Sequence, residues 1–192
     1  MAAHGRRGAS LGGDWSGLVV MVAGTSWDGN RFPEHHMAMQ LSRYAPVLFV
    51  DPPLSPVTVR RHPELAPSAA GPALRCIGPR LARLTTVVLP GKDRTGVSAV
   101  TDVLLRRSLR RALRALGSPS VSALVVVGPR PILGCAREAL SVYYAYDDFG
   151  AGASLMGVPQ RRLHRVEREV ALRADVVVAA SASQAERWRA SG

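Results

Sequence analysis

The chain has 192 residues, enough to bury a core as one domain, and a formal net charge of +11 from 25 Lys and Arg against 14 Asp and Glu. Clustered cations are typical of nucleic-acid or anionic-membrane binding, but nearly every base is Arg, as a GC-rich coding sequence produces without selection for a partner. A solvated basic surface is therefore weighed equally against a functional patch, and nucleic acid is not the expected partner. No segment reaches the ~20 apolar residues of a membrane-spanning helix.

The first residues differ in composition from the rest. Residues 1–13 are rich in Gly, Ala and Arg without an apolar period, and they lack the apolar run of a signal peptide. We predict a flexible leader over residues 1–16 and one folded domain over 17–192. Cys76 and Cys135 stand far apart in apolar surroundings, which favours two buried, reduced thiols and a cytoplasmic location.

The domain opens with a strand, a turn, a helix and a second strand. Residues 18–23 are continuously apolar, as in a strand that is buried on both faces. A polar turn over 24–31 precedes a helix near 34–44, which Pro33 starts, and the second strand, 46–50, ends on Asp51. Residues 51–72 are Pro-rich and aperiodic, so we expect a long surface loop.

The second half alternates in the same way. Residues 74–77 and 84–89 read as strands, either a hairpin or one bent element, and 97–116 is the clearest helix. Strands at 121–127, 142–146 and 175–180 alternate with helices at 131–140 and 159–173, and Ser181 caps a last helix. Strands separated by helices predict an α/β fold with a Rossmann-like doubly wound parallel sheet.

Polar or turn-forming residues follow four of these strands: the turn at Gly24, Asp51, Gly128, and the pair Asp147 and Asp148. The carboxyl ends of parallel strands share one edge, so we expect one cleft there. Glycine and a helix N-terminus in the first turn suit an anion, although an ordinary connector remains an equal alternative. The candidate substrate-binding residues are Gly24, Thr25, Trp27, Asp28, Arg31, His35, His36, Asp51 and Gly128.

Asp147 and Asp148 are the candidate catalytic residues, because a carboxylate at a strand end can orient or deprotonate a sugar hydroxyl. The alternative is that one of them only starts the following turn. His35 and His36 point about 100° apart on a helix, so one at most faces the cleft. Neither has a second ligand at metal-binding spacing, and no metal is expected.

The first turn lacks the glycine patterns of NAD and ATP sites, which disfavours an oxidoreductase or a methyltransferase. The helix at 97–116 carries an Arg-rich face, for which a solvated surface is favoured over contact with an anionic membrane. This face consists of Arg106, Arg107, Arg110, Arg111 and Arg114.

Three motifs carry a resemblance to a known family: VLFVDPP at 47–53 after WDG at 27–29, YDDF at 146–149, and Glu167 and Glu169 before RADVVVAAS at 173–181. Together they resemble the N-terminal domain of bacterial GT-B glycosyltransferases of the group 1 or family 4 type. The resemblance implies that this domain binds the acceptor and that a C-terminal domain holds a nucleotide-sugar. It also implies transfer without a metal or cofactor, with Asp147 or Asp148 where relatives often place a catalytic His.

The resemblance thus predicts a single domain equal to the N-terminal half of a GT-B fold, and no donor-binding half follows within the chain, so we expect a fragment or a half that needs a partner. The leading hypothesis is sugar transfer to a glycan or lipid-linked acceptor in cell envelope polysaccharide biosynthesis, at the inner face of the membrane. The alternative is a non-catalytic Rossmann-like binding module that docks on an anionic surface or a partner protein.

Overall fold

The computed structural model describes residues 13–91, 94, 96–117, 120–154 and 158–190. Over these residues the protein is an α/β structure around one seven-stranded sheet with the order β3-β4-β2-β1-β5-β6-β7. All neighbouring strands pair in parallel except β3 and β4. The strands are β1 Leu18–Val22, β2 Val47–Val50, β3 Leu74–Gly78, β4 Leu81–Leu84, β5 Val121–Val127, β6 Leu140–Ala145 and β7 Val176–Ala179.

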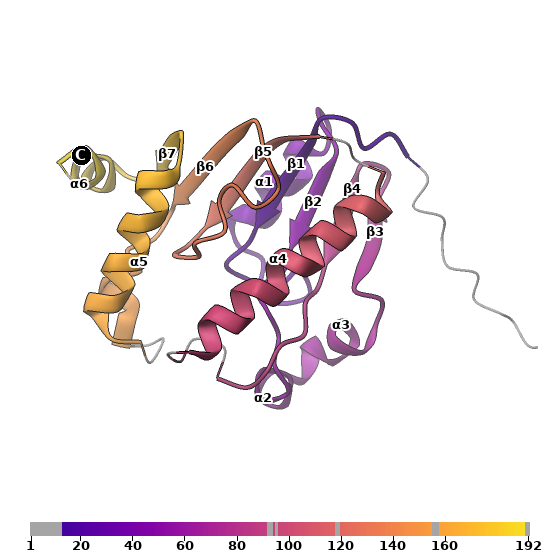
Figure 1. Ribbon diagram of the computed structural model, residues 1–192, viewed down its shortest axis with the longest axis horizontal. Helices are drawn as coiled ribbons and strands as arrows, with labels where there is room; N and C mark the ends of the chain where they lie inside the picture. The colour runs from indigo at the N-terminus through magenta and orange to yellow at the C-terminus, as the bar shows by residue number, and fades with distance from the viewer. Residues whose placement is uncertain (1–12, 92–93, 95, 118–119, 155–157, 191–192) are drawn as a thin grey trace, which may run out of the picture.

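Helices cover both faces of the sheet, as the prediction of a doubly wound sheet requires. Figure 1 shows α4 and α5 in front of the sheet and α1 behind it. The α-helices are α1 Pro33–Leu41, α2 Pro56–Arg61, α3 Ala66–Ala70, α4 Val97–Ala115, α5 Gln160–Arg173 and α6 Ala182–Ala190, and the short 3-10 helices are η1 Pro63–Leu65 and η2 Ala151–Ser154. The Rossmann-like layering expected from the alternation of strands and helices is therefore observed.

Alternate residues of the central strands pack into two separate hydrophobic cores, one on each face of the sheet. Val20 and Leu48 pack with Leu105 of α4 on one face, whereas Met21 and Phe49 pack with α1 on the other. Side chains on both faces of β1 and β2 are almost all buried, because these strands lie in the middle of the sheet and helices cover both of its faces. This explains why their sequences are continuously apolar rather than alternating.

The strand order reverses between β1 and β5, which are neighbours in the sheet, with Leu18 paired to Val121, although they are far apart in the chain.

 Between the end of β1 and the start of β5, the chain forms β2, β3 and β4 on one side of β1, and it then crosses to the other side. In a doubly wound sheet, a crevice opens at the carboxyl edge where the order reverses in this way. The fold therefore places the ends of β1 and β5 at the expected position of a ligand site.

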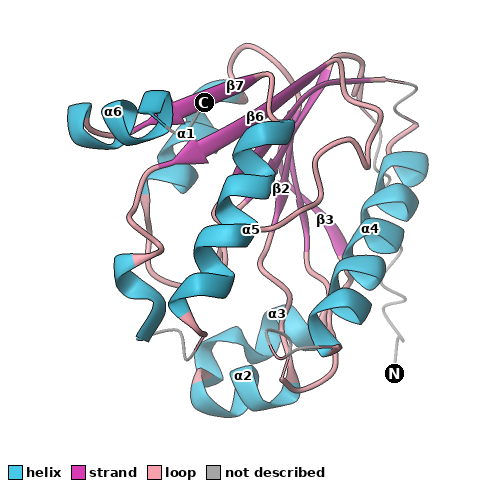
Figure 2. Ribbon diagram, turned by 60° about the vertical axis from the view of Figure 1, so that its left-hand side comes forward, coloured by secondary structure: helices cyan, strands magenta, loops and turns pink. Residues whose placement is uncertain are grey.

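The expected loop over 51–72 is wrong, because this segment contains α2, η1 and α3. Each of these short helices has Pro in its first turn, and Ser55 caps α2 by accepting a hydrogen bond from the Thr58 N–H at 3.2 Å. Proline lacks an N–H that the first turn of a helix does not use, so these prolines start helices instead of preventing them. Figure 2 shows α2 and α3 beyond the end of the sheet, near the start of α4.

Three further expectations differ from the structure. The strand expected at 84–89 is β4, Leu81–Leu84, which forms the antiparallel hairpin with β3. Residues 131–140, which the structure describes, do not form the expected helix. Gly134 and Arg137 have positive φ values of 81° and 54°, which interrupt an α-helix. The helix expected at 34–44 ends at Leu41.

Two expectations about burial also change. Trp15 is buried in the main core at 3% exposure, so the folded part begins before residue 17, and residues 1–12 of the expected leader lie outside the described residues. Cys76 is exposed rather than buried and Cys135 is partly buried, and both are free thiols. Ser181 caps α6 as predicted, accepting a hydrogen bond from the Gln184 N–H at 3.3 Å.

Candidate functional site

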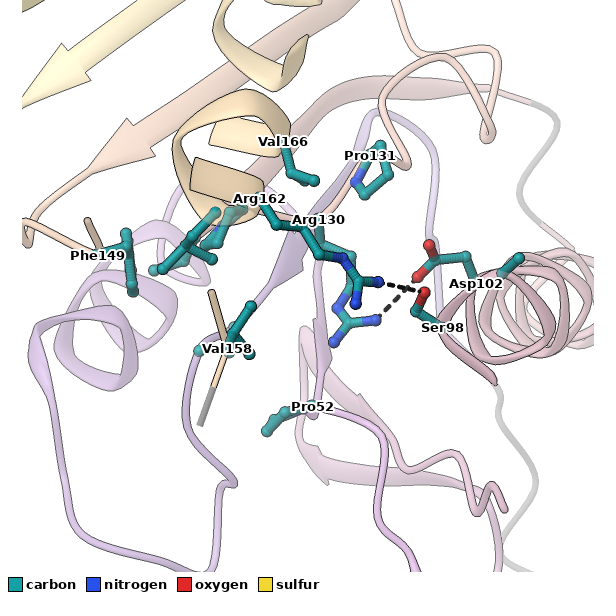
Figure 3. A pocket seen from close by; sticks show the side chains of 16 residues that line it. Pro52, Ser98, Asp102, Arg130, Pro131, Phe149, Val158, Arg162 and Val166 are labelled. Carbon is teal, nitrogen blue, oxygen red and sulfur yellow. Dashed lines mark hydrogen bonds and ion pairs between the residues drawn. The ribbon is translucent and has the colours of Figure 1, made fainter. Parts of the chain in front are cut away.

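A pocket of about 340 Å³ lies at the carboxyl edge of the sheet, where the strand order reverses. Gly24 after β1, Pro52 after β2 and Gly128 after β5 contribute to its lining, together with the first turns of α4 and α5. Figure 3 shows the pocket between these two helices. Its lining residues are Ala23, Gly24, Pro52, Ser98, Ala99, Asp102, Val127, Gly128, Pro129, Arg130, Pro131, Phe149, Val158, Arg162, Leu163 and Val166.

Two of the predicted substrate-binding residues, Gly24 and Gly128, line this pocket. Gly128 has a φ of 94°, and a Cβ at this position would lie 3.2 Å from the Phe149 ring. A side chain there would strain the backbone and press on Phe149, so this position requires glycine. A Cβ on Gly24 would make only ordinary contacts, 3.6 Å from Tyr146 Oη and 3.7 Å from Glu34 Oε1.

Asp51 and Asp28 do not line this pocket, and their carboxylates join an ion network around the buried Arg83. Arg83 is 1% exposed, and its Nε and Nη1 donate to Asp51 Oδ2 and Asp28 Oδ2, both at 2.6 Å. Thr85 Oγ1 also donates to Asp51 Oδ2 at 2.6 Å, and the Trp27 N–H donates to Asp51 Oδ1 at 2.8 Å. The network therefore fixes the first turn to β2 and β4.

Ser68 of α3 completes the network. Its hydroxyl accepts from Arg83 Nη2 at 3.0 Å and donates to Asp28 Oδ2. Partial burial raises the pKa of Asp28, but hydrogen bonds from Arg83 and Ser68 outweigh this effect and hold the pKa below its ordinary value. Asp28 is therefore a poor proton acceptor at neutral pH, and its visible role is to join α3 to the first turn.

Glu34 lies behind Gly24, fully buried in the first turn of α1. Its Oε1 accepts from the Thr25 hydroxyl at 2.7 Å and from the Thr25 N–H at 3.2 Å. Its Oε2 is buried and has no hydrogen-bond partner among the described residues. Burial, and then the charge of Glu34, raise the pKa of Tyr146 to about 12. Thr25 is thus held against α1 by Glu34 rather than directed into the pocket.

The two histidines have different environments. His35 is 2% exposed, its Nδ1 accepts from the Phe32 N–H at 3.1 Å, and its Nε2 lies 3.2 Å from the Ser26 carbonyl oxygen. Because Nδ1 is an acceptor, the ring carries its proton on Nε2 and donates it to Ser26. His36 and Arg31 are exposed, and neither lines the pocket.

We expect His35→Ala to lower the free energy of unfolding by about 1–3 kcal/mol, because the Ser26 carbonyl and the Phe32 N–H lose a partner in a buried turn. His36→Ala, its exposed neighbour on the same helix, is the control and should change stability by less than about 0.5 kcal/mol. Urea unfolding followed by circular dichroism measures both. Equal effects of the two substitutions would contradict the structural role of His35.

The two candidate catalytic acids follow β6 but do not line the pocket, whereas the next residue, Phe149, does. Asp148 Oδ1 accepts from the Ala151 N–H at 3.1 Å and pairs with Arg187 Nη1 at 3.0 Å. The bond from Ala151, and then the bond from Arg187, hold the pKa of Asp148 below its ordinary value despite some desolvation. Asp148 therefore stabilises the turn, and the exposed Asp147 is the acid that remains available at this strand end.

Arg187 also joins the far edge of the sheet to α5 and α6. Glu167, 1% exposed, accepts from Tyr143 Oη at 3.0 Å and from Arg187 Nη2 at 3.1 Å. Burial raises the pKa of Glu167, although the Tyr143 hydroxyl and Arg187 act in the opposite direction. Trp188 packs edge-on against Tyr143, with ring centroids 5.6 Å apart. Glu167, which belongs to one of the family-like motifs, thus has a structural role here.

The predicted Arg face of α4 is divided in the structure. Arg106 is partly buried and its Nη2 donates to the carbonyl of Pro131, a pocket residue. The exposed members of the face are Arg107, Arg110, Arg111 and Arg114. No α-helix in the described part of the chain has the length and apolar character needed to cross a bilayer.

Sequence reasoning missed four functional candidates: Arg83, Glu34, Arg130 and Arg162. Arg83 lies in β4, between apolar residues. An Arg in such a strand indicates a buried ion partner, and this signal could have identified it. Glu34 follows Pro33 in the first helical turn, and no sequence pattern shows that it is buried. Arg130 follows the Gly128-Pro129 strand end, so its position was accessible to the same reasoning that identified Gly128.

No protein-family model matches this chain, and no curated protein sequence matches it. The residues of the pocket and their geometry therefore provide the basis for a proposed function. Within the described residues, no group of three or more His, Cys, Asp or Glu side chains is arranged to hold a metal ion.

Proposed function

We propose that this chain is the acceptor-side domain of a GT-B glycosyltransferase, which transfers a sugar from a nucleotide-sugar to a glycan or lipid-linked acceptor together with a donor-binding domain. The observation that carries the proposal is the position of the pocket at the carboxyl edge of a doubly wound sheet, beside the switch in strand order. The family-like motifs around Trp27, Asp147 and Glu167 agree with it. No cofactor is needed for this reaction.

The pocket combines features that suit an acceptor. Phe149, Val158 and Val166 provide an apolar wall for a sugar ring or a lipid-linked chain, and Arg130 and Arg162 provide donors for polar groups. Asp147, two residues before Phe149, is the acid that we assign to proton removal from the acceptor hydroxyl, with the donor phosphate as the alternative base. Asp148 holds the turn that positions it.

A pocket-filling substitution tests this proposal. Ala99 lines the pocket on α4, and Ala99→Trp should reduce sugar transfer by at least about tenfold, because a large indole occupies the space of the acceptor. Ala115→Trp, on an exposed position of the same helix outside the lining, is the matched control and should retain activity.

The measurement is transfer of labelled sugar by the full-length gene product, with a panel of nucleotide-sugars and with polyprenyl-linked and polysaccharide acceptors. Asp147→Asn should lower kcat with little change in KM for the acceptor. Transfer at the normal rate by Ala99→Trp would rule out this pocket as the acceptor site. The absence of transfer with every donor and acceptor would contradict the proposed activity.

A further inference from the structure

Two guanidinium groups come together in the pocket. Arg130 follows β5 and Arg162 lies in the first turn of α5, and Figure 3 shows both side chains reaching toward α4. Arg130 Nη1 donates to Asp102 Oδ1 at 2.9 Å, and Arg162 Nη2 donates to Ser98 Oγ at 2.7 Å. Ser98 and Asp102 are one helical turn apart, so α4 holds the two guanidinium groups side by side.

Among the described lining residues, guanidinium groups outnumber carboxylates. Asp102 is the sole carboxylate among the described lining residues, and it faces two guanidinium groups. Arg162 also lies near the positive end of the α5 dipole, and neither α4 nor α5 has an acidic residue in its first turn. Two guanidinium groups beside two positive helix ends give this part of the lining a chemistry that suits an anionic group.

The apolar part of the pocket lining indicates what else the ligand should contain. Phe149, Val158 and Val166 are apolar, and the pocket of about 340 Å³ is far larger than a single small ion. Gly128, with its φ of 94°, has no side chain to press on the Phe149 ring of this apolar part. A ligand that fills the pocket therefore needs an anionic group joined to a less polar body.

We propose that the pocket binds a phosphate ester, with its phosphate between Arg130 and Arg162 and its organic part against Phe149 and Val166. A guanidinium group presents several N–H donors in one plane, and two of them from different elements suit a group with several acceptor oxygens. This inference rests on the proposed function, where the ester is either a phosphorylated acceptor or the diphosphate of the donor. In both cases the recognised chemistry is the same.

The test is calorimetric titration of the full chain with a hexose phosphate, with UDP-glucose and with inorganic phosphate. Arg162→Met should weaken binding of the ester by roughly tenfold to a hundredfold, because a charged hydrogen-bond donor is lost while the side-chain length is kept. Arg161→Met, the exposed neighbour outside the pocket lining, should leave binding unchanged within about twofold. Circular dichroism and urea unfolding of both variants show whether they fold.

The different ligands separate the two sources of phosphate. Binding of the hexose phosphate assigns the site to a phosphorylated acceptor, and binding of UDP-glucose alone assigns it to the donor; either result supports the proposal when Arg162→Met weakens it. Binding that is unchanged in folded Arg162→Met, or absent for both esters, overturns it. Phosphate-ester binding without sugar transfer would leave this inference standing and contradict the transferase, whereas transfer with unaltered acceptor and donor binding in Arg162→Met would do the reverse.

Discussion

Replacing Arg83 with Met should lower the free energy of unfolding by about 3–5 kcal/mol, the largest effect on stability that we expect from one substitution of a charged residue. Arg83 is 1% exposed and its guanidinium binds Asp51, Asp28 and Ser68. Without it, Thr85 and the Trp27 N–H are the donors that the buried Asp51 carboxylate keeps among the described residues. The substitution thus leaves a buried negative charge without a cation.

Urea unfolding measured by circular dichroism gives this difference. Arg75→Met is the matched control, because Arg75 Nη2 lies 3.7 Å from Asp28 in a partly exposed pair and should contribute less than about 1 kcal/mol. A loss below about 1 kcal/mol for Arg83→Met would show that the ion network around Arg83 does not hold the first turn in place. The first turn should also become more open to proteolysis in Arg83→Met, since Asp51 holds Trp27.

Phe49→Ala is expected to cost about 3–5 kcal/mol of stability, because its ring fills the core beneath the first turn. Phe49 is fully buried in the middle of the sheet. Its ring centroid lies 4.9 Å from that of Trp27 and 5.1 Å from that of His35. Truncation therefore opens a cavity under both residues, and Trp27 should become more exposed to water.

Urea unfolding gives the stability. An increase in acrylamide quenching of tryptophan fluorescence in Phe49→Ala reports on Trp27, because Trp15 and Trp188 pack with the other core. Tyr44→Ala is the control for loss of an aromatic ring, since Tyr44 is 81% exposed, and it should change stability by less than about 0.5 kcal/mol. A small effect of Phe49→Ala, similar to that of Tyr44→Ala, would mean that the ring cluster does not support the turn.

Much of the fold was predictable because local patterns and tertiary packing agree. The apolar runs at β1 and β5 became central strands, and the Leu spacing of α4 placed Leu105 and Leu109 in the core. The region between Asp51 and Pro72 was predicted wrongly. Its prolines stand at the starts of short helices, and the sequence does not show whether a proline starts a helix or interrupts one.

The candidate site was predictable only in outline. Parallel strands place their carboxyl ends at one edge, so Gly24 and Gly128 could be assigned to a common cleft from strand order alone. Asp51 and Asp28 were equally well placed by that rule, yet Arg83 binds both. The partner stands 32 residues from Asp51, and no local pattern reports such a distant ion pair.

The order of the amino acids was enough to predict the layered α/β architecture, the edge of the sheet that carries the polar residues and the glycines that line the pocket. Periodicity and turn chemistry are local properties, and they suffice for these features. The packing of the elements was needed to see which polar side chains bind one another inside the fold and which line the pocket. That choice depends on partners far apart in the chain: Arg83 binds Asp51 within the fold, whereas α4 brings Arg130 and Arg162 together at the pocket.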